Sequence, residues 1–286
     1  MPVAEVVDLL RCPRCGQALE LDGPGVRCPR GHRFDLARQG YLNLLQNRQP
    51  RHADTAEMVA ARQRFLGAGH YRLLADGLTG AVRAGLTAVR PAAPRGALSV
   101  LEAGAGTGWY LAALLDALPG RGVALDISAA AARRAARAHP RVAALVADTW
   151  QPLPLVDAGL DVVTSVFAPR NPGEFARVLR PDGVLAVVSP LPEHLVELRR
   201  ALGLLEVGED KQERLSEALT GSFRPVAERP LVHRARWSPA VVADLVGMGP
   251  NAFHLDPQQR AERVARLADP TEVTVAVSVS TWALRR

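Results

Sequence analysis

The sequence of 286 residues contains little cysteine, almost no lysine and no long apolar run. Cysteine occurs only at Cys12, Cys15 and Cys28, and an odd number confined to one short segment is not the disulfide framework of a small secreted protein. No apolar run approaches the roughly 18 to 20 residues that span a bilayer. Glu5 and Asp8 lie where a signal peptide would have its apolar core. We therefore expect a cytoplasmic protein without a membrane segment.

Lysine occurs once, at Lys211, so almost all of the 35 positive charges belong to arginine, and against 29 acidic residues they give a net charge of +6. Guanidinium groups hold phosphates through paired hydrogen bonds and stack on bases, which suits a nucleic-acid partner. The codon usage of a GC-rich genome would produce the same bias. The composition, with 48% hydrophobic and 22% charged residues, indicates a globular protein and leaves both explanations open.

The three cysteines and one histidine have the spacing of a metal site. Cys12-Pro-Arg-Cys15 is followed, after twelve intervening residues, by Cys28-Pro-Arg-Gly-His32. Two ligands from each of two turns can surround a tetrahedral Zn²⁺ ion, and four protein ligands leave no open position for water. We predict a structural zinc ion held by Cys12, Cys15, Cys28 and His32. A redox role for the CxxC pair would leave Cys28 and His32 unexplained.

A linker and two helices are predicted after this module. Residues Gln46 to His52 are polar and contain proline, which predicts a mobile linker. Asp54 and Glu57 resemble a capping box, and they predict a helix that ends before Gly67-Ala68-Gly69. A second helix is predicted from about residue 71 to about residue 89, followed by a proline-containing separator up to residue 96.

From residue 97 onward short apolar runs alternate with helical segments, the pattern of a parallel sheet with crossover helices. The predicted strands are 98–104, 122–128, 143–148, 160–167 and 183–190. Helices are predicted at 129–138 and 173–180. Residues 272–284 alternate with a period of two, which predicts a late strand, antiparallel to the others.

The glycine-rich sequence after the first of these strands is the main candidate for a binding site. Glu102-Ala-Gly104-Ala105-Gly106-Thr-Gly108 places alternate glycines before a helix, so the backbone can turn sharply and approach a ligand closely. It resembles motif I of class I methyltransferases that use S-adenosyl-L-methionine (SAM), not the GxGxxG of dinucleotide sites. Asp126 and Asp148 end the next two strands, where carboxylates would accept the ribose hydroxyls and, in that family, the adenine amine. A nicotinamide-type Rossmann domain is the alternative.

Two absences narrow the methyl acceptor. The fourth strand is followed by Phe167-Ala168-Pro169 and not by the Asn/Asp-Pro-Pro-aromatic signature of enzymes that methylate exocyclic amines of adenine or cytosine. No cysteine remains outside the zinc cluster for the covalent mechanism of C5-pyrimidine methylation. A ring nitrogen, a ribose oxygen or a small molecule remains as acceptor.

Several motifs spread over the chain occur together in one enzyme family. They are Cys-x2-Cys-x12-Cys-x3-His, Phe34-Asp35-x-Ala37 with Gly40-Tyr41-x-Asn43-Leu44-Leu45, Asp54-x-Ala56-Glu57-Met58-x2-Ala61-Arg62, Phe65-Leu66-x-Ala68-Gly69-His70-Tyr71, Phe167-Ala168-Pro169 and Pro192-x-His194-Leu195. Together they resemble the RlmA family of 23S rRNA (guanine-N1)-methyltransferases, specifically in the first 71 residues and only generically in the cofactor core. The composition rich in alanine and arginine resembles the actinobacterial branch, the TlrB type, which modifies G748 and confers tylosin resistance.

The resemblance implies a fold, a reaction and a partner. The fold class is α/β, a class I SAM-dependent methyltransferase (Rossmann-like, mostly parallel sheet) with a small N-terminal zinc-ribbon-like domain. The domains would be a zinc-binding RNA-recognition module at 1–45, a linker and helices at 46–95, and the SAM-dependent methyltransferase domain at 96–286. The reaction would transfer a methyl group to N1 of a guanine, G748 in the favoured branch, in a domain II hairpin of 23S rRNA. The family also implies a homodimer.

The resemblance also assigns residues to the cofactor site. The expected SAM contacts are Tyr71, Glu102, Gly104, Ala105, Gly106, Gly108, Trp109, Asp126, Asp148 and His194. Trp109 stands where the family more usually has tyrosine, and Glu102 stands where it has aspartate.

The group that removes the guanine N1 proton is not identified by the sequence. His70, Asp157 and Glu174 are candidates for it, and Asn251, Phe253 and His254 are candidates for the pocket of the target base. Two other functions stay open: a SAM-dependent methyltransferase of a small molecule, and a non-enzymatic zinc RNA-binding protein. The intact set of Glu102, Asp126 and Asp148 argues against the second of these.

Overall fold

A computed structural model of the chain describes residues 2–46, 53–90, 96–208, 210–249, 251–254 and 256–285. The predicted linker, except for Gln46, and most of the predicted separator therefore lie outside the described residues. None of the helices in the described part of the chain has the length and apolar character of a bilayer-spanning segment.

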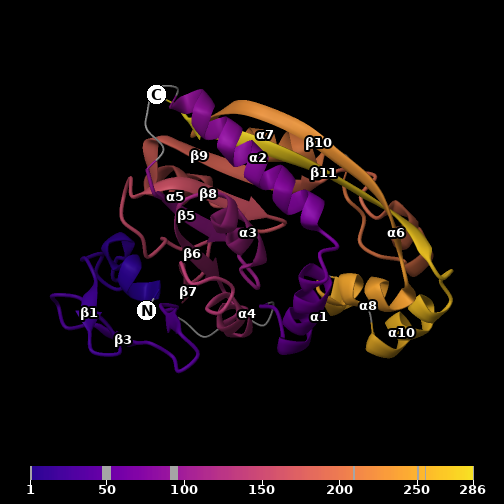
Figure 1. Ribbon diagram of the computed structural model, residues 1–286, viewed down its shortest axis with the longest axis horizontal. Coiled ribbons are helices and arrows are strands. Elements are labelled where there is room, and N and C mark those ends of the chain that lie inside the picture. Colours follow the sequence, from indigo (N-terminus) through magenta and orange to yellow (C-terminus); the bar gives the residue numbers. More distant parts are fainter. Residues whose placement is uncertain are drawn as a thin grey trace.

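The described residues form a central sheet with the strand order β10-β11-β9-β8-β5-β6-β7-β4 (Figure 1). The parallel strands are β4 (Tyr41–Asn43), β5 (Leu98–Ala103), β6 (Gly120–Asp126), β7 (Val142–Val146), β8 (Leu160–Val166) and β9 (Leu179–Pro190). The antiparallel strands are β11 (Thr271–Leu284), which pairs with β9, and β10 (Phe223–Trp237) at the edge. The chain runs from β5 outward to β7, then returns to β8 on the other side of β5, so the strand order reverses between β5 and β8. Ligands of such sheets bind outside the carboxyl ends of the strands at this switch point.

The inner strands of the sheet are buried on both faces, whereas the edge strand β10 is largely exposed. Val100 and Val162 pack in one apolar cluster, and their neighbours Leu101 and Val163 pack in the other. The helices on the first face are α1 (Ala56–Gly67), α2 (Arg72–Val89), α3 (Trp109–Ala117), α4 (Ala129–Ala135), α6 (Val196–Leu202), α8 (Pro239–Gly247) and α10 (Pro257–Ala265), with the short α9 (Asn251–His254) after α8. The helices on the second face are α5 (Pro172–Val178) and α7 (Lys211–Thr220).

The amino-terminal module completes the second face. It contains the 3-10 helices η1 (Pro2–Glu5) and η2 (Val7–Leu9) and a three-stranded antiparallel sheet of β1 (Glu20–Asp22), β2 (Gly25–Arg27) and β3 (Arg33–Asp35). Leu9 and Leu10 share one apolar cluster with the central sheet, and an isolated bridge joins Leu10 to Leu155. In Figure 1 this module and the group formed by α1, α8 and α10 lie at opposite ends of the molecule.

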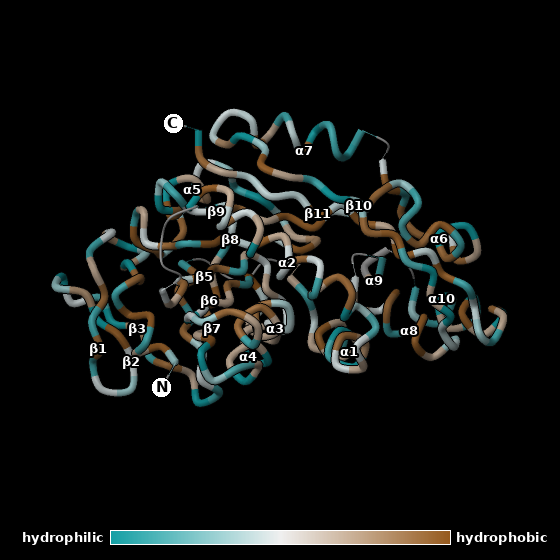
Figure 2. The backbone as a smooth tube through the Cα atoms, turned by 45° about the horizontal axis from the view of Figure 1, so that its top comes forward, coloured by the Kyte–Doolittle hydropathy of each residue, from teal (hydrophilic) through white to brown (hydrophobic). Residues whose placement is uncertain are grey.

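The predicted strands of the parallel sheet are found within a few residues, and β11 is antiparallel as expected. β10 was not predicted, because Pro225, Pro230 and many charged, exposed residues hide its strand character; such residues are typical of an edge strand. Figure 2 shows the hydrophilic stretches of β10 and α7 beside the more hydrophobic inner strands. β4 pairs with β7, so residues 41–43 contribute to the central sheet although they follow the zinc ligands closely.

The predicted capping box at Asp54 and Glu57 is wrong by one residue. The cap is Thr55, whose Oγ1 accepts a hydrogen bond from the Met58 amide at 3.3 Å. Aspartate is on average the better cap, although threonine is also common at this position. The structure decides between them because the Asp54 carboxylate forms an ion pair with Arg62.

Candidate cofactor and metal sites

The four predicted zinc ligands converge in the amino-terminal module. Their ligand atoms all lie within 4.8 Å of one another. His32 Nδ1 lies 3.4 Å from the sulfurs of Cys12 and Cys28, and the Cys15 and Cys28 sulfurs are 3.7 Å apart. A tetrahedral zinc ion, with bonds of about 2.3 Å to sulfur and about 2.0 Å to nitrogen, sets neighbouring ligands about 3.6 to 3.8 Å apart. The three short separations are close to this geometry, so the cluster fits a zinc ion with small side-chain adjustments and with Nδ1 as the histidine ligand.

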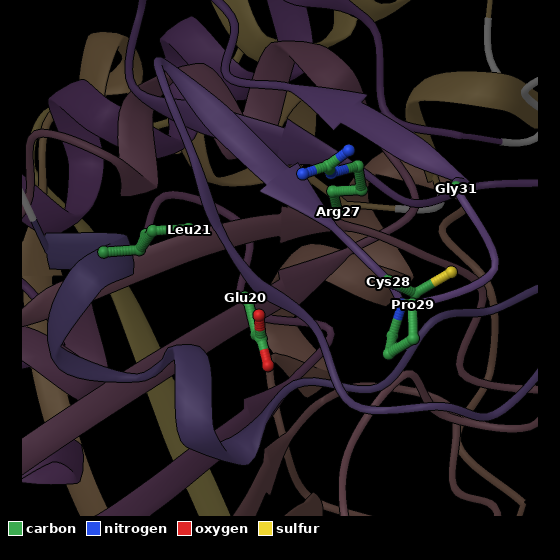
Figure 3. A pocket seen from close by; sticks show the side chains of 6 residues that line it. All are labelled: Glu20, Leu21, Arg27, Cys28, Pro29 and Gly31. Carbon is green, nitrogen blue, oxygen red and sulfur yellow. The ribbon is translucent and has the colours of Figure 1, made fainter.

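A hollow of about 220 Å³ lies on the module surface beside Cys28. Figure 3 shows the side chains that line it: Glu20 and Leu21 of β1, Arg27 of β2, and Cys28, Pro29 and Gly31 of the second ligand turn. Arg27 is exposed, and its guanidinium lies 3.4 Å from Asp22. The metal site therefore adjoins an exposed surface that carries both charged and apolar groups.

The glycine-rich loop follows β5 at the switch point, and its shape requires glycine. Gly104, Gly106 and Gly108 have φ angles of +70°, +55° and +73°, which side chains rarely adopt. A Cβ atom on Gly104 would lie 2.4 Å from the Cβ of Ala168, which follows β8. The amides of Gly104 and Ala105 both donate to the carbonyl of Leu125 in β6. The loop is thus held between β6 and β8, with α3 starting directly after it.

Asp126 lies at the carboxyl end of β6 and holds this loop. Its Oδ2 accepts from the Gly106 amide at 2.7 Å, and its Oδ1 accepts from the Ser128 amide at 2.8 Å. Each carboxylate oxygen keeps a further lone pair for a ligand hydroxyl. Asp148, which follows β7, accepts from the Trp150 amide at 2.9 Å through Oδ1 and is half-buried. The structure therefore places both predicted acids at the carboxyl edge, on neighbouring strands.

Glu102 is buried beneath the loop, where its Oε2 accepts from the Leu111 amide of α3 at 3.0 Å. Burial, together with the negative charge of Asp126, raises the pKa of Glu102 to about 8. In the free protein Glu102 is therefore mostly uncharged at neutral pH, because its surroundings disfavour a negative charge. A cationic ligand at this point would restore the carboxylate.

Replacement of Glu102 by glutamine is expected to stabilise the free protein at alkaline pH. Since the folded-state pKa is raised, Glu102 contributes stability below about pH 4.5 that is lost as the pH rises to about 8. Glutamine does not titrate, so the free energy of unfolding of the variant should be higher than that of the wild type by about 4 kcal/mol at pH 9. Near pH 4 the two free energies should be equal. Urea unfolding at both pH values measures the difference. Glu213→Gln, which removes the same charge from an exposed position, is the control. The expectation would be contradicted if Glu102→Gln changed the free energy of unfolding by the same amount at both pH values.

Two buried hydroxyl groups near the loop have no hydrogen-bond partner within the described residues. They are Thr107 Oγ1 in the loop and the Tyr110 hydroxyl in the first turn of α3. Tyr110 is electrostatically close to Tyr71, Glu102 and Arg62. Buried polar atoms are rarely left unpaired, so these hydroxyls indicate a polar ligand beside the loop. The amino-acid part of SAM, with its ammonium and carboxylate groups, would supply such partners.

Tyr71 and His194 come from distant parts of the sequence and lie close together. Tyr71, the residue before α2, is buried, and its ring centroid lies 6.4 Å from that of His194. Both rings contact Phe167 after β8, at 6.2 Å from Tyr71 and 5.6 Å from His194. Trp109 begins α3 and packs edge-on against Tyr110 at 5.0 Å. The predicted cofactor residues are thus assembled around the carboxyl ends of β5 to β9.

His194 is placed to donate a hydrogen bond and not to accept a proton. Its Nδ1 accepts from the Ala276 amide at 3.2 Å, so in the neutral ring the proton is on Nε2. Burial, with the positive charges of Arg199 and Lys211, lowers the pKa of His194 to about 4. The imidazole is therefore neutral at physiological pH, with a single N–H available to a ligand.

Two residues without a predicted role lie at the same edge. Arg62 of α1 pairs with Asp54, donates to the Met248 carbonyl at 2.6 Å, and would lie 3.0 Å from a Cβ atom on Gly106. Trp150 follows Asp148 and is 61% exposed. Arg62 belongs to one of the family motifs, which was the available signal, whereas the exposure of Trp150 follows only from the fold.

The residues considered for proton transfer and for the base pocket are mostly placed elsewhere. Asp157 and Glu174 both pair with Arg177, beyond the amino end of β8. His70 packs against Phe65 and Trp237, and burial lowers its pKa. Asn251 accepts from the Leu205 amide, while the side chains of Phe253 and His254 lie outside the described residues. No general base is assigned from these groups.

Comparisons with known families match both parts of the chain. The family described as "RlmA, N-terminal", a zinc ribbon, matches residues 10–51, and the family described as "Methyltransferase domain" matches residues 100–183. These matches confirm the predicted fold class and enzyme class, with SAM and a structural zinc ion as the cofactors.

Curated relatives match almost the whole chain. A provisionally assigned 23S rRNA (guanine-N(1)-)-methyltransferase of Micromonospora griseorubida is 52% identical over 284 residues, 96% of both chains. The 23S rRNA (guanine(748)-N(1))-methyltransferase of Streptomyces fradiae is 44% identical over 274 residues, also 96% of both chains. A third relative, YxjB of Bacillus subtilis, is 33% identical over 68% of both chains. The chain therefore belongs to the RlmA family of 23S rRNA (guanine-N1)-methyltransferases.

Proposed function

We propose that this protein transfers a methyl group from SAM to N1 of a guanine in 23S rRNA, at G748, and thereby gives resistance to tylosin-type macrolides. The observation that carries the proposal is one chain that combines a docked Cys3His zinc ribbon with a complete SAM loop and its strand-end acids. The identity of 44% to the G748 enzyme of Streptomyces fradiae supports the choice of guanine. We further propose a domain II hairpin as substrate, a homodimer as the active form and the cytoplasm as the compartment.

The chain's own residues divide the work of the cofactor site. When bound, SAM supplies an electrophilic methyl group on a sulfonium. Asp126 would accept the ribose hydroxyls, Asp148 the adenine amine, and Glu102 with the Tyr110 hydroxyl would face the amino-acid part. The Gly104–Gly108 loop brings backbone to the ligand without side chains in between. Positioning of this kind is the main contribution an enzyme makes to an in-line displacement.

The acceptor would lie toward β8 and β9, beside the cofactor. Phe167 is 41% exposed and packs against His194, and Trp150 is exposed after β7. Exposed aromatic rings at the mouth of a site can stack an unpaired base, which is how single-stranded RNA is commonly recognised. The His194 Nε2–H would offer a hydrogen bond within the same space. We infer that the target guanine leaves its stack to reach this position.

The zinc ribbon would hold the RNA backbone through its exposed arginines. Arg27 and Arg33 are engaged with Asp22, and Arg33 also with Asp35. Arg14 and Arg30 are exposed and have no carboxylate partner in the described part of the chain, and the Arg14 guanidinium lies 6.0 Å from the Phe34 ring centroid. These two arginines, which lie beside the zinc ligands, would therefore be free to bind phosphates, as would the exposed Arg38.

Exchange of Arg14 and Arg30 for alanine is expected to weaken hairpin binding and reduce its dependence on salt. Two lost phosphate contacts lower the slope of log K against log [salt] by about 1.4 to 1.8. Fluorescence anisotropy with a labelled hairpin at several salt concentrations measures both effects. Arg224→Ala with Arg229→Ala, two exposed arginines of β10, is the control pair. An unchanged slope in the ribbon variant would remove this module from the RNA contact.

Transfer of tritium from labelled SAM to unmodified 23S rRNA tests the proposed function itself. Primer extension on the product should stop one nucleotide before position 748, because N1 methylation blocks base pairing at that guanine. A stop at another guanine would correct the position. Labelling of a mixed metabolite extract instead of the RNA would favour a small-molecule methyltransferase. Sedimentation of the purified protein tests the homodimer.

A further inference from the structure

Arg170 lies in the loop after β8 with a buried nitrogen that nothing in the described structure satisfies. Its Nη1 is shielded from solvent without a hydrogen-bond partner. Arg90 and Arg199 also have a nitrogen of this kind, but both pair with carboxylates: Arg90 with Asp161 and Arg199 with Glu206. Arg170 has no carboxylate partner among the described residues. Its burial also lowers the pKa of the guanidinium, because desolvation disfavours the charged form.

Lys211, the only lysine of the chain, is a second cation in this region, and its charge interacts with that of Arg170. It is half-buried, it has no ion-pair partner within the described residues, and it is the first residue of α7. A positive charge there is opposed by the positive end of the helix dipole. Burial, then the charges of Arg170 and Arg214, lowers its pKa. Burial, the helix dipole and the neighbouring positive charges all oppose a charge on Lys211, so we infer that this lysine serves binding and not stability.

The start of α7 is fixed at the carboxyl end of β9. The Gln212 amide donates through Nε2 to the Pro190 carbonyl at 3.1 Å, and its Oε1 accepts from the Ser189 hydroxyl at 3.1 Å. β9 pairs with β8 up to Val166, so the loop that carries Arg170 emerges beside the same edge. Lys211 is also one of the charges that depress the pKa of His194. The two cations are thus held near His194 by the backbone of the fold.

This place is on the acceptor side of the site. The glycine loop, Asp126 and Asp148 follow β5, β6 and β7, whereas Arg170 and Lys211 lie by β8 and β9, across the switch point. Phe167, which stacks on His194, is only three residues before Arg170. A guanine nucleotide in this space has an uncharged base and a phosphate on each side. The acceptor therefore carries negative charge, on the phosphates next to the target base, that could pair with the two cations.

We propose that Arg170 and Lys211 form a cradle for a backbone phosphate next to the target guanine, and so position that nucleotide for methylation. This rests on the proposed function, because it assumes an RNA acceptor. The guanidinium supplies planar paired donors, and the compact ammonium of lysine supplies three more. The ion pairing that the two cations lack among the described residues would be completed by a phosphate of the bound RNA strand.

Neutral variants Arg170→Gln and Lys211→Gln give a signature that a structural role would not. Each is expected to raise the hairpin Kd about five- to twentyfold and lower the salt slope by about 0.7 to 0.9, while the SAM Kd stays within twofold. Lys211→Gln should raise the melting temperature by about 2 °C, because an uncompensated charge is removed. Lys211→Arg should recover part of the RNA affinity. Arg214→Gln, on the same helix and paired with Asp210, is the matched control.

A hairpin with a single neutral methylphosphonate, moved through the phosphates that flank the target guanine, tests the contact directly. At the contacted phosphate, the methylphosphonate should weaken binding to the wild type down to the affinity that the double variant Arg170→Gln/Lys211→Gln has for the unmodified hairpin. The same methylphosphonate should not weaken binding to the double variant any further. If the methylphosphonate weakened binding by the same factor in the wild type and in the double variant at every position, the proposal would be overturned. A raised SAM Kd with unchanged hairpin binding would assign the two cations to the SAM carboxylate and overturn it as well. If the wild type fails to methylate 23S rRNA at all, the proposed function itself fails, which is a different result.

Discussion

Replacement of His32 by alanine is expected to release the zinc ion and abolish methylation of 23S rRNA. The strands of the ribbon are three residues long, too short to hold their own fold, and Cys12 and Cys28 sit in the apolar cluster that joins the ribbon to the central sheet. Binding of structural zinc contributes about 10 to 16 kcal/mol in zinc-finger peptides at pH 7. Loss of one of four ligands should therefore unfold the region between Cys12 and Leu36.

Elemental analysis and hydrogen exchange measure this outcome. We expect the wild type to hold one zinc per chain and the variant almost none, with amide protection lost over the ribbon strands and retained in β5 to β9. The rate of rRNA methylation should fall at least about a hundredfold, whereas SAM should still bind, because the loop and Asp126 lie outside the ribbon. His233→Ala, at an exposed histidine of β10, is the control. Full zinc content in the His32 variant would show that Nδ1 is not a ligand.

Replacement of Asp126 by asparagine is expected to weaken SAM binding by about two to three orders of magnitude. Both carboxylate oxygens accept backbone N–H groups, from Gly106 and Ser128, and an amide would turn one acceptor into a donor that faces another donor. The variant also loses charged acceptors for the ribose hydroxyls. Two such hydrogen bonds correspond to about 3 to 4 kcal/mol, or roughly a factor of 10² to 10³ in Kd. Isothermal titration with SAM measures the change.

Asp161→Asn is the matched control for this experiment, since Asp161 is a buried aspartate at the opposite edge of the sheet. It accepts from the Ser99 amide at 2.8 Å and pairs with Arg90 and Arg180. The loss of its carboxylate should lower the melting temperature, because Arg90 and Arg180 lose a charged partner. The SAM Kd should stay within twofold. An equal loss of SAM affinity in both variants would mean that the effect of Asp126 is one of stability.

The arginine bias has a structural use that the composition did not indicate. Many arginines form ion pairs that join distant segments: Arg121 with Asp8 fixes the ribbon to β6, Arg64 with Asp244 joins α1 to α8, and Arg90 with Asp161 joins α2 to β8. An excess of arginine is therefore partly consumed inside the fold. The arginines without carboxylate partners are the informative ones for RNA.

Much of the fold was predictable because its signals are local. The apolar runs of β5 to β9 mark strands that are buried on both faces, and the period of two marks β11 as a strand. β10 could not be predicted, since an edge strand with prolines and exposed charges lacks both signals and is specified only by its pairing with β11. The choice of Thr55 over Asp54 as the helix cap likewise depended on a partner, Arg62, that lies on the next turns of α1.

The sequence by itself predicted the ligands of the zinc site and the glycine-rich loop with its two strand-end acids, because each depends on spacing within one turn or at one strand end. The tertiary structure decided which charges are compensated. It placed Tyr71, Phe167 and His194 in contact and made His194 a neutral donor. It also brought the charges of Lys211 and Arg170 within range of each other, with no ion-pair partner for either among the described residues. Desolvation and charge pairing depend on which elements pack together, and the packing of β8, β9 and α7 is a property of the whole sheet. The single lysine, unremarkable as a count, acquired a chemical role only there.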